Sequence, residues 1–110
     1  MRQMRHPPIE DVALEQVFHA LSDPFRLGVI RRLADGGEQS CAALEGGRAK
    51  SSVSHHFRVL RDSGLILTRP EGTTHMNSLR AAEVEARFPG LLGAVLAAAG
   101  APCDTAPRDE

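Results

Sequence analysis

The chain has 110 residues, of which 42% are hydrophobic and 25% charged, and its formal net charge is −1. A chain of this length can build one hydrophobic core but not a core and a sizeable catalytic cleft. It also lacks the Gly-rich phosphate loop, the Gly-x-Ser-x-Gly elbow and the His-Glu-x-x-His motif, so we expect no enzyme. No run of eighteen apolar residues occurs, and residues 1–10 lack the apolar region of a signal peptide, which favours a cytoplasmic protein without membrane contact.

The first third of the chain predicts an arm followed by two helices. Residues 1–9 have no periodicity and are expected to form a flexible N-terminal arm. Residues 11–21 have the periodicity of an amphipathic helix, with an apolar face formed by Leu14, Val17, Phe18 and Leu21. Asp23 is suited to cap the next helix and Pro24 to occupy its first position, and this helix is expected to continue to Gly36.

The centre of the chain predicts two helices joined by a tight turn. Ser40 is expected to cap a short helix that ends at Leu44, and two glycines provide the turn after it. Residues 51–61 form the next predicted helix, which ends at Gly64 and whose core side carries Val53, His56, Phe57 and Leu60. Its outer side offers hydroxyls, an imidazole and an arginine, a composition that suits the groove of a polyanion better than a protein core.

Two segments rich in β-forming residues, 65–69 and 74–78, flank a turn signal at residues 70–73. They predict a β-hairpin, or wing. Helix, turn, helix and wing within about 40 residues is the arrangement of a winged-helix DNA-binding domain, in which the second helix enters the major groove. The predicted fold is therefore mainly α with a small β-hairpin, a winged helix-turn-helix.

The distribution of charge agrees with a phosphate-binding face. Residues 48–80 contain six basic and two acidic residues, a local charge of +4, so the remainder of the chain carries −5. A basic centre on an acidic body is the electrostatic pattern of a nucleic-acid-binding protein. Chance variation of charge along the chain is the alternative explanation.

The C-terminal part predicts two further helices and a dimer contact. Residues 81–87 are expected to form one or two helical turns, and Pro89 interrupts them. Residues 91–99 predict a final helix with a broad apolar face, which needs a covering partner. We expect the first and last helices to pair in a homodimer through Leu14, Val17, Leu91, Leu92, Val95 and Leu96. Residues 100–110 are expected to be a disordered tail, which leaves one domain at residues 10–99.

The predicted DNA contacts lie on the second helix of the motif and on the wing. Arg58 is the best candidate for reading a base, because its planar fork matches O6 and N7 of guanine. Serine, threonine and histidine side chains can contact phosphates or bases, whereas a solvated helix face and hairpin tip are the alternative. The full set is Lys50, Ser51, Ser52, Ser54, His55, Arg58, Arg61, Arg69, Thr73, Thr74 and His75.

Two segments resemble the ArsR/SmtB family of bacterial transcription regulators. Residues 20–26, Ala-Leu-Ser-Asp-Pro-Phe-Arg, resemble the start of the family's second helix. Residues 53–66, Val-Ser-His-His-Phe-Arg-Val-Leu-Arg-Asp-Ser-Gly-Leu-Ile, resemble its recognition helix and first wing strand. The similarity covers roughly residues 12–99. It implies a homodimer that is paired through the first and last helices, binds an inverted-repeat operator and changes its DNA affinity with a signal, often a metal.

The metal sites familiar from this family are absent from the sequence. Some members carry Cys-x-Cys in the third helix, where this chain has only Cys41, and others use ligands on the last helix, where residues 91–99 offer none. Imidazole suits nickel, zinc and copper, so a weakly bound ion at His6 is the remaining metal candidate. Cys41 and Cys103 are the alternative, as a redox switch, although neither lies in a Cys-x-x-Cys setting.

These features predict a regulator that binds operator DNA as a homodimer, with a link to metal or stress response. Two alternatives stay open: a thiol-based redox-sensing regulator, and a winged-helix module that acts with a partner sensor protein. A module used only for protein contacts would have an apolar or acidic recognition face, which residues 51–61 do not show.

Overall fold

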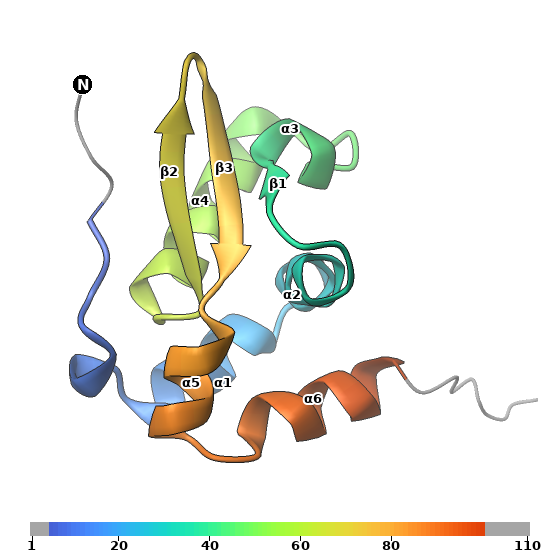
Figure 1. The fold of residues 1–110 in the computed structure, drawn as a ribbon. Coiled ribbons are helices and arrows are strands. Elements are labelled where there is room, and N and C mark those ends of the chain that lie inside the picture. Colours follow the sequence, from blue (N-terminus) through green and yellow to red (C-terminus); the bar gives the residue numbers. More distant parts are fainter. Residues whose placement is uncertain (1–4, 101–110) are drawn as a thin grey trace, which may run out of the picture.

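The structure, a computed structural model, describes residues 5–100 apart from the side chain of Lys50 (Figure 1). Within this range no helix is long and apolar enough to cross a membrane. The predicted tail lies outside the described residues except for Gly100. The elements are η1 (Ile9–Asp11, a 3-10 helix), α1 (Leu14–Leu21), α2 (Pro24–Gly36), β1 (Gln39–Ser40), α3 (Cys41–Leu44), α4 (Lys50–Asp62), β2 (Ile66–Glu71), β3 (Thr74–Leu79), α5 (Ala81–Arg87) and α6 (Leu91–Gly100).

The predicted wing is confirmed, and it belongs to a three-stranded sheet. β2 and β3 pair antiparallel, with Ile66 opposite Leu79 and Glu71 opposite Thr74. Figure 1 shows this hairpin beside α4, with its turn pointing away from α5 and α6. β1 pairs with the other side of β3, so β2 is an edge strand. The sequence did not predict β1, because two residues are too few to show an alternation of apolar and polar side chains.

The helix-turn-helix region is confirmed, and two of its helices begin at the predicted caps. Asp23 Oδ2 accepts a hydrogen bond from the Arg26 N–H at 3.0 Å, at the start of α2. Ser40 Oγ accepts one from the Ala43 N–H at 3.1 Å, at the start of α3. Each bond satisfies an N–H group that the first turn of a helix leaves without an intrahelical partner.

Burial of one face fixes the orientation of α4. Val53, Phe57 and Leu60 are 3% exposed or less, and burying a side chain of this kind contributes about 1.5–3 kcal/mol. After α4 the chain turns at Gly64, where φ is +79° and a Cβ would lie 2.6 Å from Val12 Cγ2. Glycine is needed there both for its positive φ and for the close approach of Val12.

The first helix is shorter than the sequence predicted. α1 begins at Leu14 rather than at residue 11, because η1 occupies the preceding turn and Val12 is extended. Val12 is 1% exposed and takes the core position, whereas Leu14 and Phe18 are 40% and 51% exposed. Periodicity therefore identified the apolar face of the helix, but two members of that face lie on the surface.

α6 lies at the end of the molecule opposite the wing turn, against α2 and α5 (Figure 1). Leu92 is buried, and the other large side chains of the helix are only half-buried. Between α6 and the first two helices the subunit leaves an open apolar groove of about 400 Å³. The groove is lined by Phe18, Leu21, Leu27, Val95, Ala98 and Ala99.

Candidate DNA interface

The side of α4 opposite the core is polar and exposed to solvent. Five predicted contact residues share this side: Ser51, Ser52, Ser54, His55 and Arg58. Within residues 5–100, the Arg58 guanidinium takes part in no ion pair. Its charge and donors are therefore available to a ligand from outside the subunit. The α4 helix thus has one face that packs into the core and an opposite face of exposed polar side chains that can bind a ligand.

The start of α4 is also suited to an anion. Its N-cap residue, Ala49, has no side-chain acceptor, and the first turn contains no acidic residue. The first N–H groups of the helix therefore remain for an acceptor outside it, and the helix dipole favours negative charge at this end. The predicted contact Lys50 begins the helix, but its side chain lies outside the described part of the structure.

Arg26 in α2 holds three helices together, a role that the sequence analysis missed. Its side chain is buried, with 6% of the residue exposed. Nε donates to the carbonyl of Ala20 at 2.8 Å and Nη2 to the carbonyl of His19 at 3.1 Å, at the end of α1. Nη1 lies 3.0 Å from Nδ1 of His56 in α4. Because arginine has no acceptor, Nδ1 of His56 must be unprotonated and accept this bond.

The core-side position predicted for His56 is confirmed, and the imidazole is kept neutral. Burial lowers the pKa of His56, Asp23 at 3.8 Å opposes this shift, and Arg26 adds to it, so the pKa stays below its ordinary value. The ring also packs on Phe25, at 4.9 Å between ring centroids. His56 is therefore a positioning residue of α4 and not a part of its exposed face.

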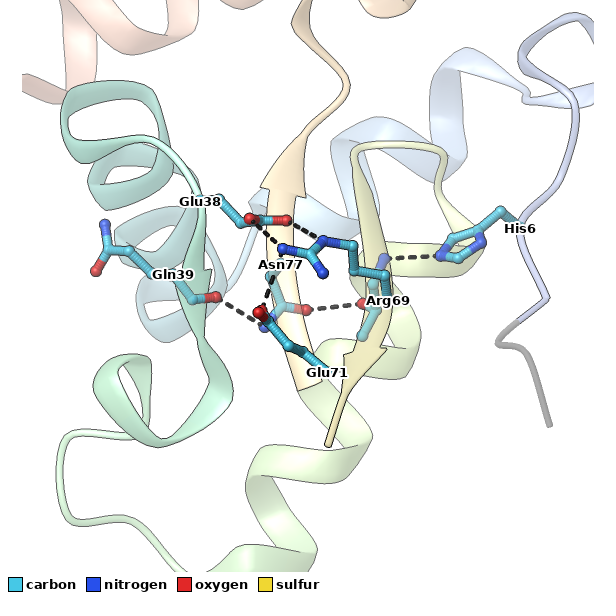
Figure 2. A network of polar contacts seen from close by, with 7 residues as sticks. His6, Glu38, Gln39, Arg69, Glu71 and Asn77 are labelled. Atoms are coloured by element: carbon cyan, nitrogen blue, oxygen red, sulfur yellow. Dashed lines mark hydrogen bonds and ion pairs between the residues drawn. The ribbon is translucent and has the colours of Figure 1, made fainter. Parts of the chain in front are cut away.

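His6 lies at the free edge of the sheet. Its Nε2 accepts a hydrogen bond from the Thr68 N–H of β2 at 2.9 Å (Figure 2). The next residue is also held, because Arg80 Nη1 donates to the Pro7 carbonyl at 2.9 Å. His6 and Pro7 of the predicted arm thus lie against the sheet, and residues 1–4 of that arm lie outside the described residues. Burial lowers the pKa of His6, and the nearby charges of Arg61 and Arg80 lower it further.

These surroundings do not fit a divalent ion. Nε2 of His6 is already engaged, and the nearby guanidinium groups repel a cation. Among the residues that the structure describes, no group of three or more His, Cys, Asp and Glu side chains could hold a metal ion. Weak nickel or zinc binding at His6 stays a prediction.

The lowered pKa values of His6 and His56 predict a loss of stability in mild acid. As the pH drops from about 6.5 toward the lowered folded pKa values, the unfolded chain takes up more protons than the folded chain, so the free energy of unfolding falls over this range. Urea unfolding at about pH 7.5 and about pH 5.5 measures this loss. The double variant His6→Gln, His56→Gln should lose less stability between the two pH values; a loss as large as that of the native chain would contradict the explanation.

The wing arginine is paired within the subunit. Arg69 donates from Nε and Nη2 to the two carboxylate oxygens of Glu38, each at 2.8 Å, and from Nη2 to Glu71 at 3.2 Å (Figure 2). These bonds join the wing to the segment before β1. The predicted DNA contact of Arg69 would therefore require this pairing to be broken or shared. Thr73, Thr74 and His75 lie exposed at the turn, as a wing contact requires.

Arg61, a predicted DNA contact, and Cys41, a predicted redox residue, are less exposed to solvent than the polar face of α4. Arg61 is half-buried beside Cys41 and His75, and burial lowers its pKa. The Cys41 thiol lies 3.2 Å from Nδ2 of Asn77, a fully buried side chain whose Oδ1 accepts from Thr68 Oγ1 at 2.7 Å. The second cysteine of the redox alternative, Cys103, lies outside the described residues.

Two residues of the predicted dimer interface belong to the core of the subunit. Val17 and Leu92 are 1% and 6% exposed in the single chain, so their side chains are already covered. This placement corrects the prediction for both side chains. Leu14 remains exposed, and Leu91, Val95 and Leu96 are half-buried. Phe18, which was not predicted for the interface, is the most exposed large apolar side chain among the described residues.

The fold and the polar helix define the chain as a winged helix-turn-helix protein. A family model described as a helix-turn-helix domain matches residues 21–69. The uncharacterized HTH-type transcriptional regulator YceK of Bacillus subtilis (strain 168) is 38% identical over 86 residues, which cover 76% of this chain and 86% of that protein.

Solved structures point to the same class. An ArsR family transcriptional regulator is 31% identical with a TM-score of 0.61, over 66% of this chain and 81% of that one. The transcriptional repressor BigR from Xylella fastidiosa is 27% identical with a TM-score of 0.61, over 80% of this chain and 86% of that one. The chain belongs to the ArsR family of helix-turn-helix transcriptional regulators, as the two sequence motifs predicted.

Proposed function

We propose that the protein regulates transcription by binding operator DNA with the exposed face of α4. The observation that carries this proposal is the division of α4 into a buried face and a polar face, on which Arg58 forms no ion pair with another described residue. The buried face holds the helix rigidly, and the polar face offers the donors that major-groove recognition uses. The uncapped start of the helix adds a place for a backbone phosphate.

Footprinting on the DNA that flanks the protein's own gene tests this proposal. We expect protection of a limited site, with competition by unlabelled copies of that site and little competition by unrelated DNA. Equal competition by both DNAs would show that the protein binds phosphates without reading a sequence, and would contradict the proposed function.

We further propose that the active form is a homodimer paired through α1 and α6. The support is the open groove between these helices together with the exposure of Phe18 and Leu14. We propose that a second copy of the chain occupies this groove. A two-fold axis through such a dimer would also place the two α4 helices on one side of it. Half-sites one DNA turn apart, about 34–36 Å, fit such a dimer and give the operator its inverted repeat.

The dimer proposal predicts that Phe18→Lys shifts the protein to a monomer in sedimentation at micromolar concentration. Phe18 is 51% exposed in the subunit, so the change should leave the fold of the single chain intact while placing a charge in the interface. Leu67→Lys is the matched control, because Leu67 is 40% exposed on the wing strand β2. A native chain that sediments as a monomer would rule out this architecture.

A further inference from the structure

The Arg26 guanidinium connects the helix proposed to form the dimer with the helix proposed to read DNA. Nε and Nη2 donate to carbonyls at the end of α1, and Nη1 donates to Nδ1 of His56 in α4 at 3.0 Å. This last bond exists only while Nδ1 carries no proton, because a protonated imidazole has no acceptor and a guanidinium has none either. The protonation state of one imidazole therefore decides whether α1 and α4 are joined through this arginine.

Asp23 offers the imidazole a second partner. Its Oδ2 lies 3.8 Å from Nδ1 of His56, so a small movement of the ring would bring the two atoms within hydrogen-bond distance. When Nδ1 takes up a proton it becomes a donor, which is repelled by Arg26 and attracted by the carboxylate. Burial opposes the ionisation of Asp23, but the hydrogen bond from the Arg26 N–H and nearby positive charge outweigh it, so the pKa of Asp23 lies below its usual value. The carboxylate is therefore charged where a histidine takes up its proton, and His56 has two possible arrangements.

The surroundings of His56 favour the arrangement without a proton at neutral pH. Among the described residues, the charged and titratable groups that face this ring are Asp23 and Arg26 at the start of α2, Arg48 in the turn before α4, and His55 on α4 itself. The Arg48 guanidinium lies 4.8 Å from the centroid of the Phe25 ring, on which His56 also packs. Burial and the two guanidinium groups outweigh the one carboxylate and keep the pKa of His56 below its ordinary value, so protonation requires mild acid.

We propose that protonation of His56 in mild acid weakens operator binding, because the imidazole leaves Arg26 for Asp23 and α4 loses this connection to α1. The inference rests on the proposed DNA-binding function and adds the regulation of that site by pH. Base reading in the major groove depends on the position of the recognition helix, so a less firmly held α4 should lose sequence preference. The expected sign is informative, because the negative charge of DNA favours protonated histidines and would by itself strengthen binding in acid.

The affinity for a duplex that carries the footprinted site, measured at fixed salt from about pH 7.5 to about pH 5, tests the proposal. The affinity of the native full-length chain should fall with pH, by up to about tenfold per pH unit for each subunit below the folded pKa of His56. His56→Asn should bind as the native chain does at neutral pH and lose much less affinity in acid. Its Oδ1 is as far along the side chain as Nδ1 and can accept from Arg26, but it does not titrate.

Two further variants separate the switch from a purely structural role. His19→Asn removes an exposed histidine of α1 and should keep the native acid loss. In Asp23→Asn the side chain can still cap α2, but it has no charge to hold the protonated ring, so the acid loss should move to lower pH. A cap with no part in the switch would change stability without moving that pH. If His56→Asn does not fold, the shift in Asp23→Asn decides the question.

The outcomes distinguish this inference from the proposed function. Three results would overturn the inference: a native affinity that stays constant or rises in acid, an equal acid loss in His56→Asn, or a loss that coincides with unfolding in circular dichroism at the same pH. A native chain that prefers the footprinted site to random DNA at neutral pH but shows no acid loss contradicts the inference alone. Equal affinity for both DNAs at neutral pH contradicts the proposed function, and this inference fails with it.

Discussion

Replacement of Arg26 by methionine is expected to lower the free energy of unfolding by about 3 kcal/mol. The carbonyl of Ala20 and Nδ1 of His56 would lose the donor that Arg26 provides, whereas the carbonyl of His19 would keep its bonds from Ser22. One buried polar group without a partner costs about 1–3 kcal/mol. Methionine retains much of the apolar length of the arginine side chain, so the loss reports the polar bonds more than a cavity. A domain of this size is stable by only about 5–15 kcal/mol.

Urea unfolding of Arg26→Met measures this loss, and Arg31→Met is its matched control. Arg31 lies on the same helix but is exposed, and substitutions at such positions usually change stability by about 0.5 kcal/mol or less. Because Arg26 also joins α2 to α4, amide hydrogens of α4 should exchange faster in the variant. A loss no larger than that of the control would show that the buried guanidinium does not hold the three helices together.

Replacement of Arg58 by alanine is expected to weaken operator binding by about 1–3 kcal/mol and to weaken binding to random DNA much less. Arg58 is exposed on the polar face of α4 and is not engaged by an ion pair within the described residues. Its planar donors can bind a guanine edge, which gives preference among bases. A phosphate contact would give no such preference.

Affinity measurements at one salt concentration, on operator and on random duplexes, separate these two roles. Arg31→Ala removes the same charge from α2 and serves as the control for net charge. Equal losses on both DNAs for Arg58→Ala would assign Arg58 to the phosphate backbone and would move base reading to another residue of α4.

The sequence predicted most of the helix-turn-helix region because its determinants are local. The apolar spacing of Val53, Phe57 and Leu60 defines the buried face of α4, and the caps at Asp23 and Ser40 depend on residues three positions apart. Local patterns of this kind are visible in a single sequence. The same spacing placed the exposed polar face of α4 correctly.

The features that the sequence missed depend on contacts between distant residues. Arg26 reaches His56, 30 positions away, and charged side chains are seldom fully buried, so composition favours a surface position for it. Arg69 has a plausible place on a DNA-facing wing, yet its partner Glu38 lies 31 positions earlier in the chain. His6 meets Thr68 across 62 positions. Neither periodicity nor turn chemistry contains this information.

The N-terminal region shows how a correct pattern can mark the wrong residues. Leu14 and Phe18 fit the helical period, but Val12 fills the core from an extended segment before α1. The approach of Val12 to Gly64 makes that arrangement possible. An extended residue that packs against a turn 52 positions away leaves no periodic signal.

Selection of bound sites from a pool of random DNA duplexes tests whether the protein reads a DNA sequence at all. Native protein is mixed with the pool at fixed salt, and the bound fraction is recovered and sequenced over several rounds. We expect enrichment of an inverted repeat with half-site centres about 10 base pairs apart, and loss of preference at a guanine position in Arg58→Ala. Binding without enrichment of any sequence would contradict this expectation.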